Sequence, residues 1–592
     1  MPSLIPKIPQ EDSNKVARAI ELARGRERYA YDYSWPPEVA MPEKIHAADQ
    51  WTIEYLLKAV EINIAVVGNG VDATAQVIEE EEKREFGAVL KSALSVENLD
   101  ESFFAGAQFV SRKSSTERPR SIAEYQNYFG VFEKPPVLQR LNALSGRPSA
   151  RQRDQLFGWQ RIAGVNPMVI HSVTRLPDHF PVTEAHYTRA MGAGDSLAAA
   201  AAEGRLFLAD YALLDGAAQG VTGGRQKYMT APLALFAVAK ATGSLMPVAI
   251  QCTQTPGVGA PIFTPGDGYR WLMAQTFVQV ADANIHEAIE HLGCTHLIMG
   301  AVCMGMRRQL AESHPLRVLL EPHVKLTFAI NNNARSGLVS KGGTVDQIMG
   351  GTIEATLGAL KAGMDRFSLQ DSAPRKALAA RGVLDPTGLP VYPYREDAVP
   401  VWDAINGFVR AYIALYYKLD SDVAGDIELA AWLDELGSEE GGRLKHLRPV
   451  NTLPDLIELM SNIIFIASAQ HAAVNFPQYP FMGYVPNMPG AGWAPAPTMD
   501  TPDTEAELLL RLPPWNMTTL AADTVWQLSE VRVNYLGKYG ITAFSDPRTS
   551  PLIRDFRAAL EAVEEDIKRR DASRLLPYPF LLPSTIPASI NI

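Results

Sequence analysis

Five of the eleven histidines in this 592-residue chain lie within one stretch of 38 residues, where even spacing would put fewer than one. They are His286, His291, His296, His314 and His323. Neutral imidazole is the commonest metal ligand in proteins, so a cluster of this density predicts a metal site. The alternative, for some of the five, is that they are core histidines that hydrogen-bond to main-chain carbonyls.

The spacing of His291 and His296 sets a condition on the helix that would carry them. Residues five apart on an α-helix are separated by about 140° around its axis, so the two imidazoles would not reach one small ion. A local π turn brings residues i and i+5 together, and such turns are common at functional sites. Gly293 lowers the helix propensity between the two histidines. The sequence therefore predicts a π-bulge at this point.

Other common metal chemistries do not fit the spacing. The zincin pattern H-E-x-x-H needs a second histidine four residues after the first, but His286-Glu287 is followed by a histidine only at the fifth position. Neither Glu287 nor Glu290 has a histidine three residues later, which excludes the E-x-x-H motif of di-iron carboxylate bundles. The three cysteines are too few for a disulfide scaffold, a zinc finger or an iron–sulfur site.

The composition is that of an ordinary globular chain with an acidic balance. Hydrophobic residues make up 47% and charged residues 20% of the chain. A net charge of −11 and a pI near 5.6 argue against a nucleic-acid partner held by bulk electrostatics. No apolar run reaches the ~18 residues of a membrane span. The N-terminal MPSLIPKIPQEDSNK has no apolar signal region, so a cytoplasmic location is expected.

Helical patterning dominates the chain from Trp51 onward. Long helices are predicted at three places: the run WTIEYLLKAVEINIAVV, residues 276–310 and residues 454–474. Strand-length apolar runs broken by Gly and Pro predict a small β region at 205–215 and 232–254. The Pro- and Thr-rich piece 491–515 is expected to be mostly loop. The sequence contains no obvious linker or internal repeat, which favours a single large domain. The predicted fold is therefore mainly α, with one large helical domain over 46–592 that includes a small β subdomain.

Residues 1–45 are predicted to form a helical N-terminal extension. Apolar residues recur at i, i+3, i+4 and i+7, which is the pattern of an amphipathic helix. These residues are Val16, Ala19, Ile20 and Ala23. Two roles stay open for the apolar face: packing as a cap on the main domain, or peripheral contact with a membrane surface. Packing is favoured, because one amphipathic helix is weak evidence for lipid contact.

Longer segments resemble the lipoxygenase family over about residues 125–592. The segment THLIMGAVCMGMRRQLAESHPLRVLLEPH resembles the family's central helix and the turn after it, and ASAQHAAVNFPQYPF resembles its second ligand helix. QLFGWQRIAGVNPMVI, EGRLFLADYALLDG and the terminal ASINI are also lipoxygenase-like. The family often has Glu where Gly300 stands here. Residues 1–120 are mostly helical in pattern where plant and animal members carry a β-barrel lipid-binding module, so a bacterial-type member is expected.

The resemblance implies a non-haem iron site. The implied iron ligands are His291, His296, His471, Asn475 and the main-chain carboxylate of Ile592. His471 and Asn475 are four residues apart, so both can face one ion from an undistorted α-helix. The last 18 residues carry no charged side chain, as expected of a tail threaded inward with its carboxylate on a metal. This ligand set suits iron, and manganese remains an alternative. The other three clustered histidines match family positions that do not bind metal.

The implied activity is that of a dioxygenase acting on polyunsaturated fatty acids with a cis,cis-1,4-pentadiene unit. In the family, a hydroxide on the iron takes a hydrogen atom from the bis-allylic carbon, and O2 adds to the resulting radical to give a conjugated hydroperoxide. Linoleate, arachidonate and O2 are therefore the expected partners of a monomeric enzyme. Two alternatives remain: a hydroperoxide isomerase on the same fold, and a non-catalytic lipid-binding relative, against which the complete ligand set argues.

Several further residues match family positions around the substrate. Glu287 and Gln478 match a hydrogen-bonded bridge between the ligand helices beside the cavity. The expected apolar pocket lining is Leu338, Val345, Ile348 and Met349. Ala334 matches a position where Ala accompanies S products and Gly accompanies R products, and Ala283 replaces a bulky aromatic residue and deepens the pocket. Together they imply 13S hydroperoxide from linoleate and 12S or 15S hydroperoxide from arachidonate.

Overall fold

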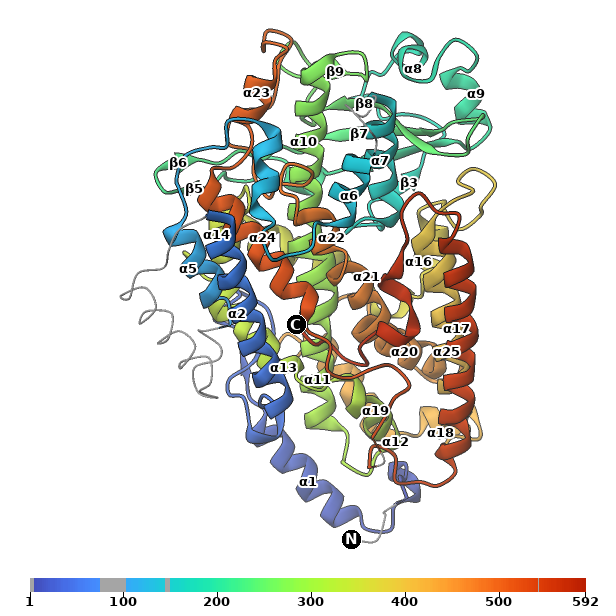
Figure 1. The fold of residues 1–592 in the computed structure, drawn as a ribbon. Helices are drawn as coiled ribbons and strands as arrows, with labels where there is room; N and C mark the ends of the chain where they lie inside the picture. Colours follow the sequence, from blue (N-terminus) through green and yellow to red (C-terminus); the bar gives the residue numbers. More distant parts are fainter. Residues whose placement is uncertain (1–4, 75–102, 144–149, 541) are drawn as a thin grey trace.

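The computed structural model describes residues 5–74, 103–143, 150–540 and 542–592. One continuous helical rod runs along the middle of the molecule (Figure 1). Its parts are α10 (Gly268–Ile285), the π-helix η5 (His286–Leu297) and α11 (Ile298–Gln309). Most side chains of α10 are buried on every side, which explains the lack of an amphipathic pattern in this part of the rod. The helix predicted at 276–310 is confirmed within this rod.

A second buried helix packs against the π-helix of the rod. It consists of α20 (Leu453–Phe465), the short π-helix η9 (Ile466–Gln470) and α21 (His471–Asn475), and it confirms the helix predicted at 454–474. Together with α22 (Gln478–Met482), this is the one stretch in the described part of the chain that is long and apolar enough to cross a membrane. Its most apolar window is 89% buried inside the fold, as in a core helix.

Other long helices surround these two. They are α2 (Ile53–Thr74), α15 (Ile353–Arg366), α17 (Pro393–Ile413), α19 (Ile427–Gly437), α24 (Trp515–Glu530) and α25 (Thr549–Asp571). The apolar residues that these helices share with the rod form one continuous core. The piece 491–515 is loop apart from α23 (Glu505–Leu510) and the first residue of α24.

A five-stranded antiparallel sheet lies at one end of the rod (Figure 1). In spatial order its strands are β3 (Ile170–Ser172), β4 (Leu206–Asp210), β7 (Leu233–Val238), β8 (Leu245–Gln251) and β9 (Ile262–Phe263). Every residue of β7 and β8 is buried, because a second, smaller apolar cluster covers the face turned away from the main core. The β region predicted at 205–215 and 232–254 is confirmed.

A small two-stranded hairpin lies outside the five-stranded sheet. It consists of β5 (Val221–Thr222) and β6 (Arg225–Gln226), joined by two glycines with positive φ, 56° and 74°. Two central residues with positive φ are what a type I′ hairpin turn requires. The hairpin lies against α14 (Thr344–Ile348), a short helix beside the centre of the molecule.

The predicted N-terminal helix exists as α1 (Lys15–Arg28), but the expectation that its apolar face packs inward is wrong. Val16 and Ile20 are 74% and 48% exposed, whereas Arg18 is only 6% exposed. Before β3, the described residues contain only two short strands, β1 (Tyr31–Asp32) and β2 (Met41–Pro42).

Specific contacts explain why α1 turns its polar side inward. The Arg18 guanidinium donates to the Glu428 carboxylate, with Nη2 2.9 Å from Oε2, and Glu428 is itself buried. Gly25 lies on the same side of α1, where a Cβ would come within 2.6 Å of the Arg307 carbonyl oxygen. A charge-assisted bond and a close backbone contact therefore orient the helix, and neither is visible in the period of its apolar residues.

After α25 the C-terminal tail of the chain runs back into the interior of the molecule. The last residue, Ile592, is 4% exposed, and the C-terminus lies in the middle of the molecule rather than at its surface (Figure 1). Asn591 anchors this tail, because its Oδ1 accepts from the main-chain N–H of Val533 at 2.8 Å.

Candidate metal centre

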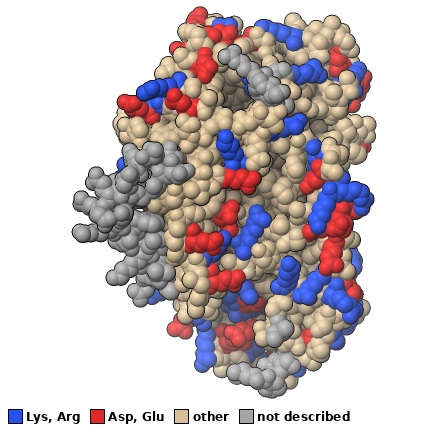
Figure 2. Space-filling view, viewed as in Figure 1, with Lys and Arg blue, Asp and Glu red and all other residues tan. Residues whose placement is uncertain are grey.

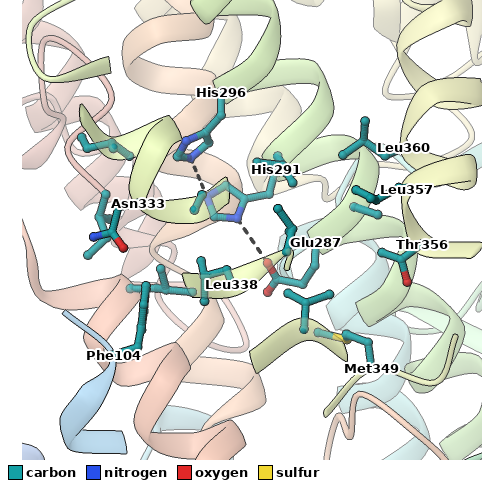
Figure 3. Close-up of a pocket in the computed structure, with 18 of the residues that line it drawn as sticks. Phe104, Glu287, His291, His296, Asn333, Leu338, Met349, Thr356, Leu357 and Leu360 are labelled. Atoms are coloured by element: carbon teal, nitrogen blue, oxygen red, sulfur yellow. Dashed lines mark hydrogen bonds and ion pairs between the residues drawn. The ribbon is translucent and has the colours of Figure 1, made fainter. Parts of the chain in front are cut away.

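Three histidine side chains from the two central helices converge in the interior. His296 Nε2 lies 3.2 Å from His291 Nε2 and 3.1 Å from His471 Nε2. All three rings are buried, with at most 5% exposure. Figure 3 shows the His291 and His296 rings directed toward one another at the edge of a cavity.

The three nitrogens fit a metal ion. A neutral imidazole has one acceptor nitrogen, so lone pairs that face one another at about 3 Å repel unless a cation lies between them. Two nitrogens each ~2.1 Å from one ion and at right angles to each other are also ~3 Å apart. Within the described residues, these three are the group whose ligand atoms all lie within 4.8 Å of one another.

The π-helix makes this convergence possible. The structure confirms the predicted widening between His291 and His296, and extends it over the twelve residues of η5. Local side chains support the distorted backbone: the Thr295 hydroxyl donates to the His291 carbonyl, and Asn331 Nδ2 donates to the His296 carbonyl at 2.8 Å. In this geometry residues i and i+5 face the same side, as the shared site requires.

The outer nitrogens of two rings are held by acceptors. His291 Nδ1 lies 3.2 Å from Glu287 Oε2, and His296 Nδ1 lies 3.2 Å from Asn331 Oδ1. An acceptor at Nδ1 favours the tautomer with the proton there and leaves the Nε2 lone pair for a metal. The Nδ1 of His471 is buried without a hydrogen-bond partner among the described residues.

The electrostatics keep the histidines neutral. Burial lowers the pKa of His291, His296 and His471, and the neighbouring rings lower it further for the last two. Burial also raises the pKa of the Glu287 carboxyl, but the nearby histidines outweigh it and hold that pKa well below its usual range. The site therefore presents neutral imidazoles, the form that binds metals, beside one ionised carboxylate.

The two remaining predicted ligands lie next to this cluster. Asn475 follows His471 by one turn and is fully buried. Its Nδ2 donates to the Leu528 carbonyl at 2.8 Å, and its Oδ1 accepts from Gln478 Nε2 at 2.9 Å. Ile592 lines the same cavity as His291 and His296.

The predicted bridge between Glu287 and Gln478 is not made in this structure. Glu287 instead contacts two histidines, because Oε1 lies 3.4 Å from His286 Nδ1 while Oε2 faces His291. Gln478 contacts Asn475. Each of the two side chains thus orients a different predicted ligand.

The other histidines of the sequence cluster point elsewhere. His286 Nε2 lies 2.7 Å from the Val474 carbonyl oxygen, and His323 Nδ1 lies 2.7 Å from the Ala588 carbonyl oxygen. His314 bonds to a buried aspartate at 3.0 Å. These rings therefore join helices and hold the C-terminal tail.

An apolar cavity of about 60 Å³ begins at the histidines (Figure 3). Of the predicted pocket residues, four line it: Ala334, Leu338, Val345 and Met349. Ile348 and Ala283 are buried but do not belong to this lining, and Ala283 lies one turn before Glu287 on the rod.

Sequence reasoning missed the N-terminal part of the cavity wall. Tyr55 of α2 contributes to the lining, as do Phe103 and Phe104, which precede α5 (Ala105–Lys113). Figure 3 shows Phe104 on the side opposite Leu357 and Leu360 of α15. The apolar run of α2 indicated a buried helix, but no motif in it identified what the helix covers.

Comparisons with known proteins agree with this geometry. The family model for lipoxygenases matches residues 107–576. The chain is 42% identical over 496 residues to the linoleate 9/13-lipoxygenase of Pseudomonas aeruginosa, which covers 80% of this chain and 70% of that protein. It is 36% identical over 448 residues to the hydroperoxide isomerase ALOXE3 of Mus musculus, which covers 74% of this chain and 62% of that relative. The crystal structure of delta413-417:GS LOX in complex with arachidonate superposes with a TM-score of 0.85 at 27% identity, covering 99% of this chain and 83% of that chain.

Proposed function

This chain belongs to the lipoxygenase family, and we propose that it oxygenates linoleate and arachidonate with a non-haem iron bound by His291, His296 and His471. Asn475 and the carboxylate of Ile592 complete the proposed ligand set. The observation that carries the proposal is the meeting of three buried, neutral imidazoles at the end of an apolar cavity.

The residues around the site have separate tasks in this proposal. Iron, when bound, supplies one-electron redox chemistry at the bis-allylic carbon. Glu287 and Asn331 hold the His291 and His296 rings so that Nε2 faces the metal. The apolar walls exclude water and align one methylene of the acyl chain. Ligand pockets usually enclose about 300–1,000 Å³, more than the 60 Å³ of this cavity, so we expect the walls to move apart as the fatty acid enters.

Ala334 is proposed to set the S configuration of the product. It lines the cavity near Leu338, where its methyl group can shield one end of the pentadiene from O2. We expect 13S hydroperoxide from linoleate, which has only one bis-allylic methylene. For arachidonate, 12S and 15S both remain proposed, and because Ala283 does not line the cavity, Val345 and Met349 are the residues that would decide between them.

Ala334→Gly is expected to shift the product toward R configuration at a different carbon, because removal of the methyl group admits O2 at the shielded end. Chiral chromatography of the hydroperoxides measures the ratio. Ala329→Gly is the matched control: it makes the same change in a buried residue of the preceding helix, away from the cavity lining, and should leave the ratio unchanged. An unaltered product from Ala334→Gly would contradict a role for Ala334 in setting the configuration.

Hydroperoxide isomerase is the second candidate, and the similarity to ALOXE3 favours keeping it. Both activities would use the same buried site, so its geometry does not separate them. Oxygen uptake does: a dioxygenase consumes O2 as conjugated diene accumulates, whereas an isomerase converts added hydroperoxide without consuming O2. We propose the dioxygenase as the main activity because the linoleate 9/13-lipoxygenase has the higher identity over a longer alignment.

We also propose that α1 contacts an anionic phospholipid surface. Its outward face presents Val16 and Ile20, and the exposed cations Lys15, Arg24 and Arg26 flank that apolar stripe. An apolar stripe with basic flanks matches a helix that lies in the plane of an anionic bilayer surface. In Figure 2, side chains of Lys and Arg are interspersed with Asp and Glu near the lower end of the view, where α1 is, and a strip of uncharged surface lies above it over α2. The outer side of α2 carries exposed apolar residues, which include Ile53 and Leu57 at 77% and 62% exposure.

The double variant Val16→Asp/Ile20→Asp is expected to lose binding to vesicles of phosphatidylglycerol by on the order of tenfold, because it places two anions where the apolar stripe meets the bilayer. Co-sedimentation with the vesicles measures the bound fraction. Val258→Asp/Met499→Asp is the matched control, since it places the same charges on exposed apolar residues outside α1 and α2. Equal binding by the two double variants would contradict the contact through α1.

A further inference from the structure

The β5–β6 hairpin holds the part of the cavity wall that carries Val345 and Met349. These two residues lie in and directly after α14, and both line the cavity. The hairpin approaches from the outside of that wall. Its Thr222 hydroxyl donates to the Gln347 carbonyl at 2.9 Å. The hairpin therefore contacts the main chain between the two lining residues.

Lys227, which follows β6, makes the strongest of these contacts. Its side chain is fully buried, and its Nζ donates to the Asp346 carbonyl at 2.5 Å and lies 3.4 Å from the Gln347 carbonyl. The last carbonyls of a helix have no partner within the helix, so α14 needs donors at this end. Burial lowers the pKa of Lys227 to about 8, which leaves the amine mostly protonated at neutral pH. A buried charge is costly unless it is hydrogen-bonded, and here the two acceptors of the ammonium are carbonyls of the cavity wall.

Main-chain bonds extend the attachment beyond α14. Gly220 N–H donates to the Gly350 carbonyl at 3.0 Å, and Thr352 N–H donates to the Ala218 carbonyl at 2.9 Å. Gly220 also has no room for a side chain, because a Cβ would lie 2.7 Å from Lys227 Cε. The hairpin and the wall are thus joined at several points over a short distance.

The wall is held from the cavity side as well. The Gly350 N–H donates to Asn284 Oδ1 at 3.3 Å, and Asn284 itself lines the cavity. The stretch 345–350 is therefore fixed between the central rod on one side and the hairpin on the other. Lys227 is the one fully buried cation in this attachment within the described residues.

We propose that Lys227 is a positioning residue that sets product specificity. By holding the carbonyls of Asp346 and Gln347, it keeps Val345 and Met349 at a fixed depth in the cavity, and so fixes which bis-allylic carbon of arachidonate lies at the metal. This inference rests on the proposed function, because it identifies what determines the position of the acyl chain there. Small displacements of substrate relative to reacting groups change rates strongly, so a loosened wall redistributes the products.

The test compares Lys227→Met with the wild-type protein. Methionine keeps most of the side-chain volume but removes all three donors. On arachidonate, the share of the minor hydroperoxide regioisomers is expected to rise by at least about threefold, with KM affected more than kcat and iron content unchanged. Thr222→Val removes one bond from the hairpin to the same wall and should shift the ratio in the same direction by less. Lys240→Met, at an exposed lysine far from α14, is the matched control and should change nothing.

Hydrogen–deuterium exchange of the peptide over 344–352 gives a readout that does not depend on activity. Exchange should be faster in Lys227→Met than in the wild type or Lys240→Met. An unchanged regioisomer ratio in both Lys227→Met and Thr222→Val would overturn the specificity role, even with faster exchange. If Lys227→Met does not fold, the ratio from Thr222→Val decides alone. A wild-type protein that forms no hydroperoxide would instead overturn the proposed function, so the two failures are distinguishable.

Discussion

His291→Ala, His296→Ala and His471→Ala are each expected to lose the iron and nearly all hydroperoxide formation. Each change removes one of three buried ligand nitrogens, of which those of His291 and His471 lie 3.2 and 3.1 Å from that of His296. Loss of residues that only orient a metal ligand already costs 10–100-fold in affinity or activity, so loss of a ligand should cost more than ~100-fold. Iron per chain by elemental analysis, together with the rate on linoleate, measures both effects.

His314→Ala is the matched control for these three variants. His314 is equally buried, but its ring bonds to Asp426 and not to the three converging histidines His291, His296 and His471. It should keep its iron. The variant leaves a cavity and removes one of the bonds to the buried Asp426 carboxylate, which still accepts from the Tyr417 hydroxyl and two main-chain N–H groups, so it is expected to melt at a lower temperature. Stoichiometric iron in any one of the three cluster variants would contradict that residue's assignment as a ligand.

Addition of one glycine after Ile592 is expected to abolish iron binding and activity. The added residue moves the terminal carboxylate away from the cluster and places a neutral peptide carbonyl in its position. The tail has no freedom to slide back, because Asn591 bonds to Val533 N–H and the Ala588 carbonyl bonds to His323. Iron content and rate are measured as for the histidine variants.

Ile592→Leu is the matched control for the extension, because it keeps the chain length and the carboxylate and changes only the side chain. It should retain iron. Full iron content and full activity in the extended protein would remove the C-terminal carboxylate from the proposed ligand set.

The arrangement of the central helices could be predicted because it depends on spacing along the chain. An interval of five residues between His291 and His296 permits a shared ion only in a widened helix, and the structure has a π-helix there. Spacing did not reveal that the π-helix is twelve residues long. Hydrogen bonds from Thr295 and from Asn331 of another helix to its main-chain carbonyls stabilise it. Contacts of that kind depend on tertiary packing.

The same dependence on tertiary packing explains the error at α1, whereas the error at Glu287 has a local cause. The period of Val16 and Ile20 identifies a helix with an apolar face but does not say which face meets the rest of the protein. The ion pair between Arg18 and Glu428, more than 400 residues apart in the chain, decides that. At Glu287 the competing partners are local: the side chain contacts His286, the residue before it, and His291, one turn later on the same helix, rather than Gln478 on another helix.

The residues that line the cavity could be predicted only in part. Ala334, Leu338, Val345 and Met349 were expected from the resemblance and do line the cavity. Tyr55 comes from a part of the chain that precedes the matched family region, so neither motif nor resemblance could place it there.

Simultaneous recording of O2 uptake and conjugated-diene absorbance tests whether an iron held by the buried histidines inserts O2 into a fatty acid. The iron-loaded protein is mixed with linoleate, and His471→Ala is the inactive reference. We expect one O2 to be consumed for each diene formed and the product to be the 13S hydroperoxide, whereas the reference should consume no O2 and form no diene. Diene loss from added hydroperoxide without O2 uptake, or no reaction at all by the iron-loaded protein, would contradict this expectation.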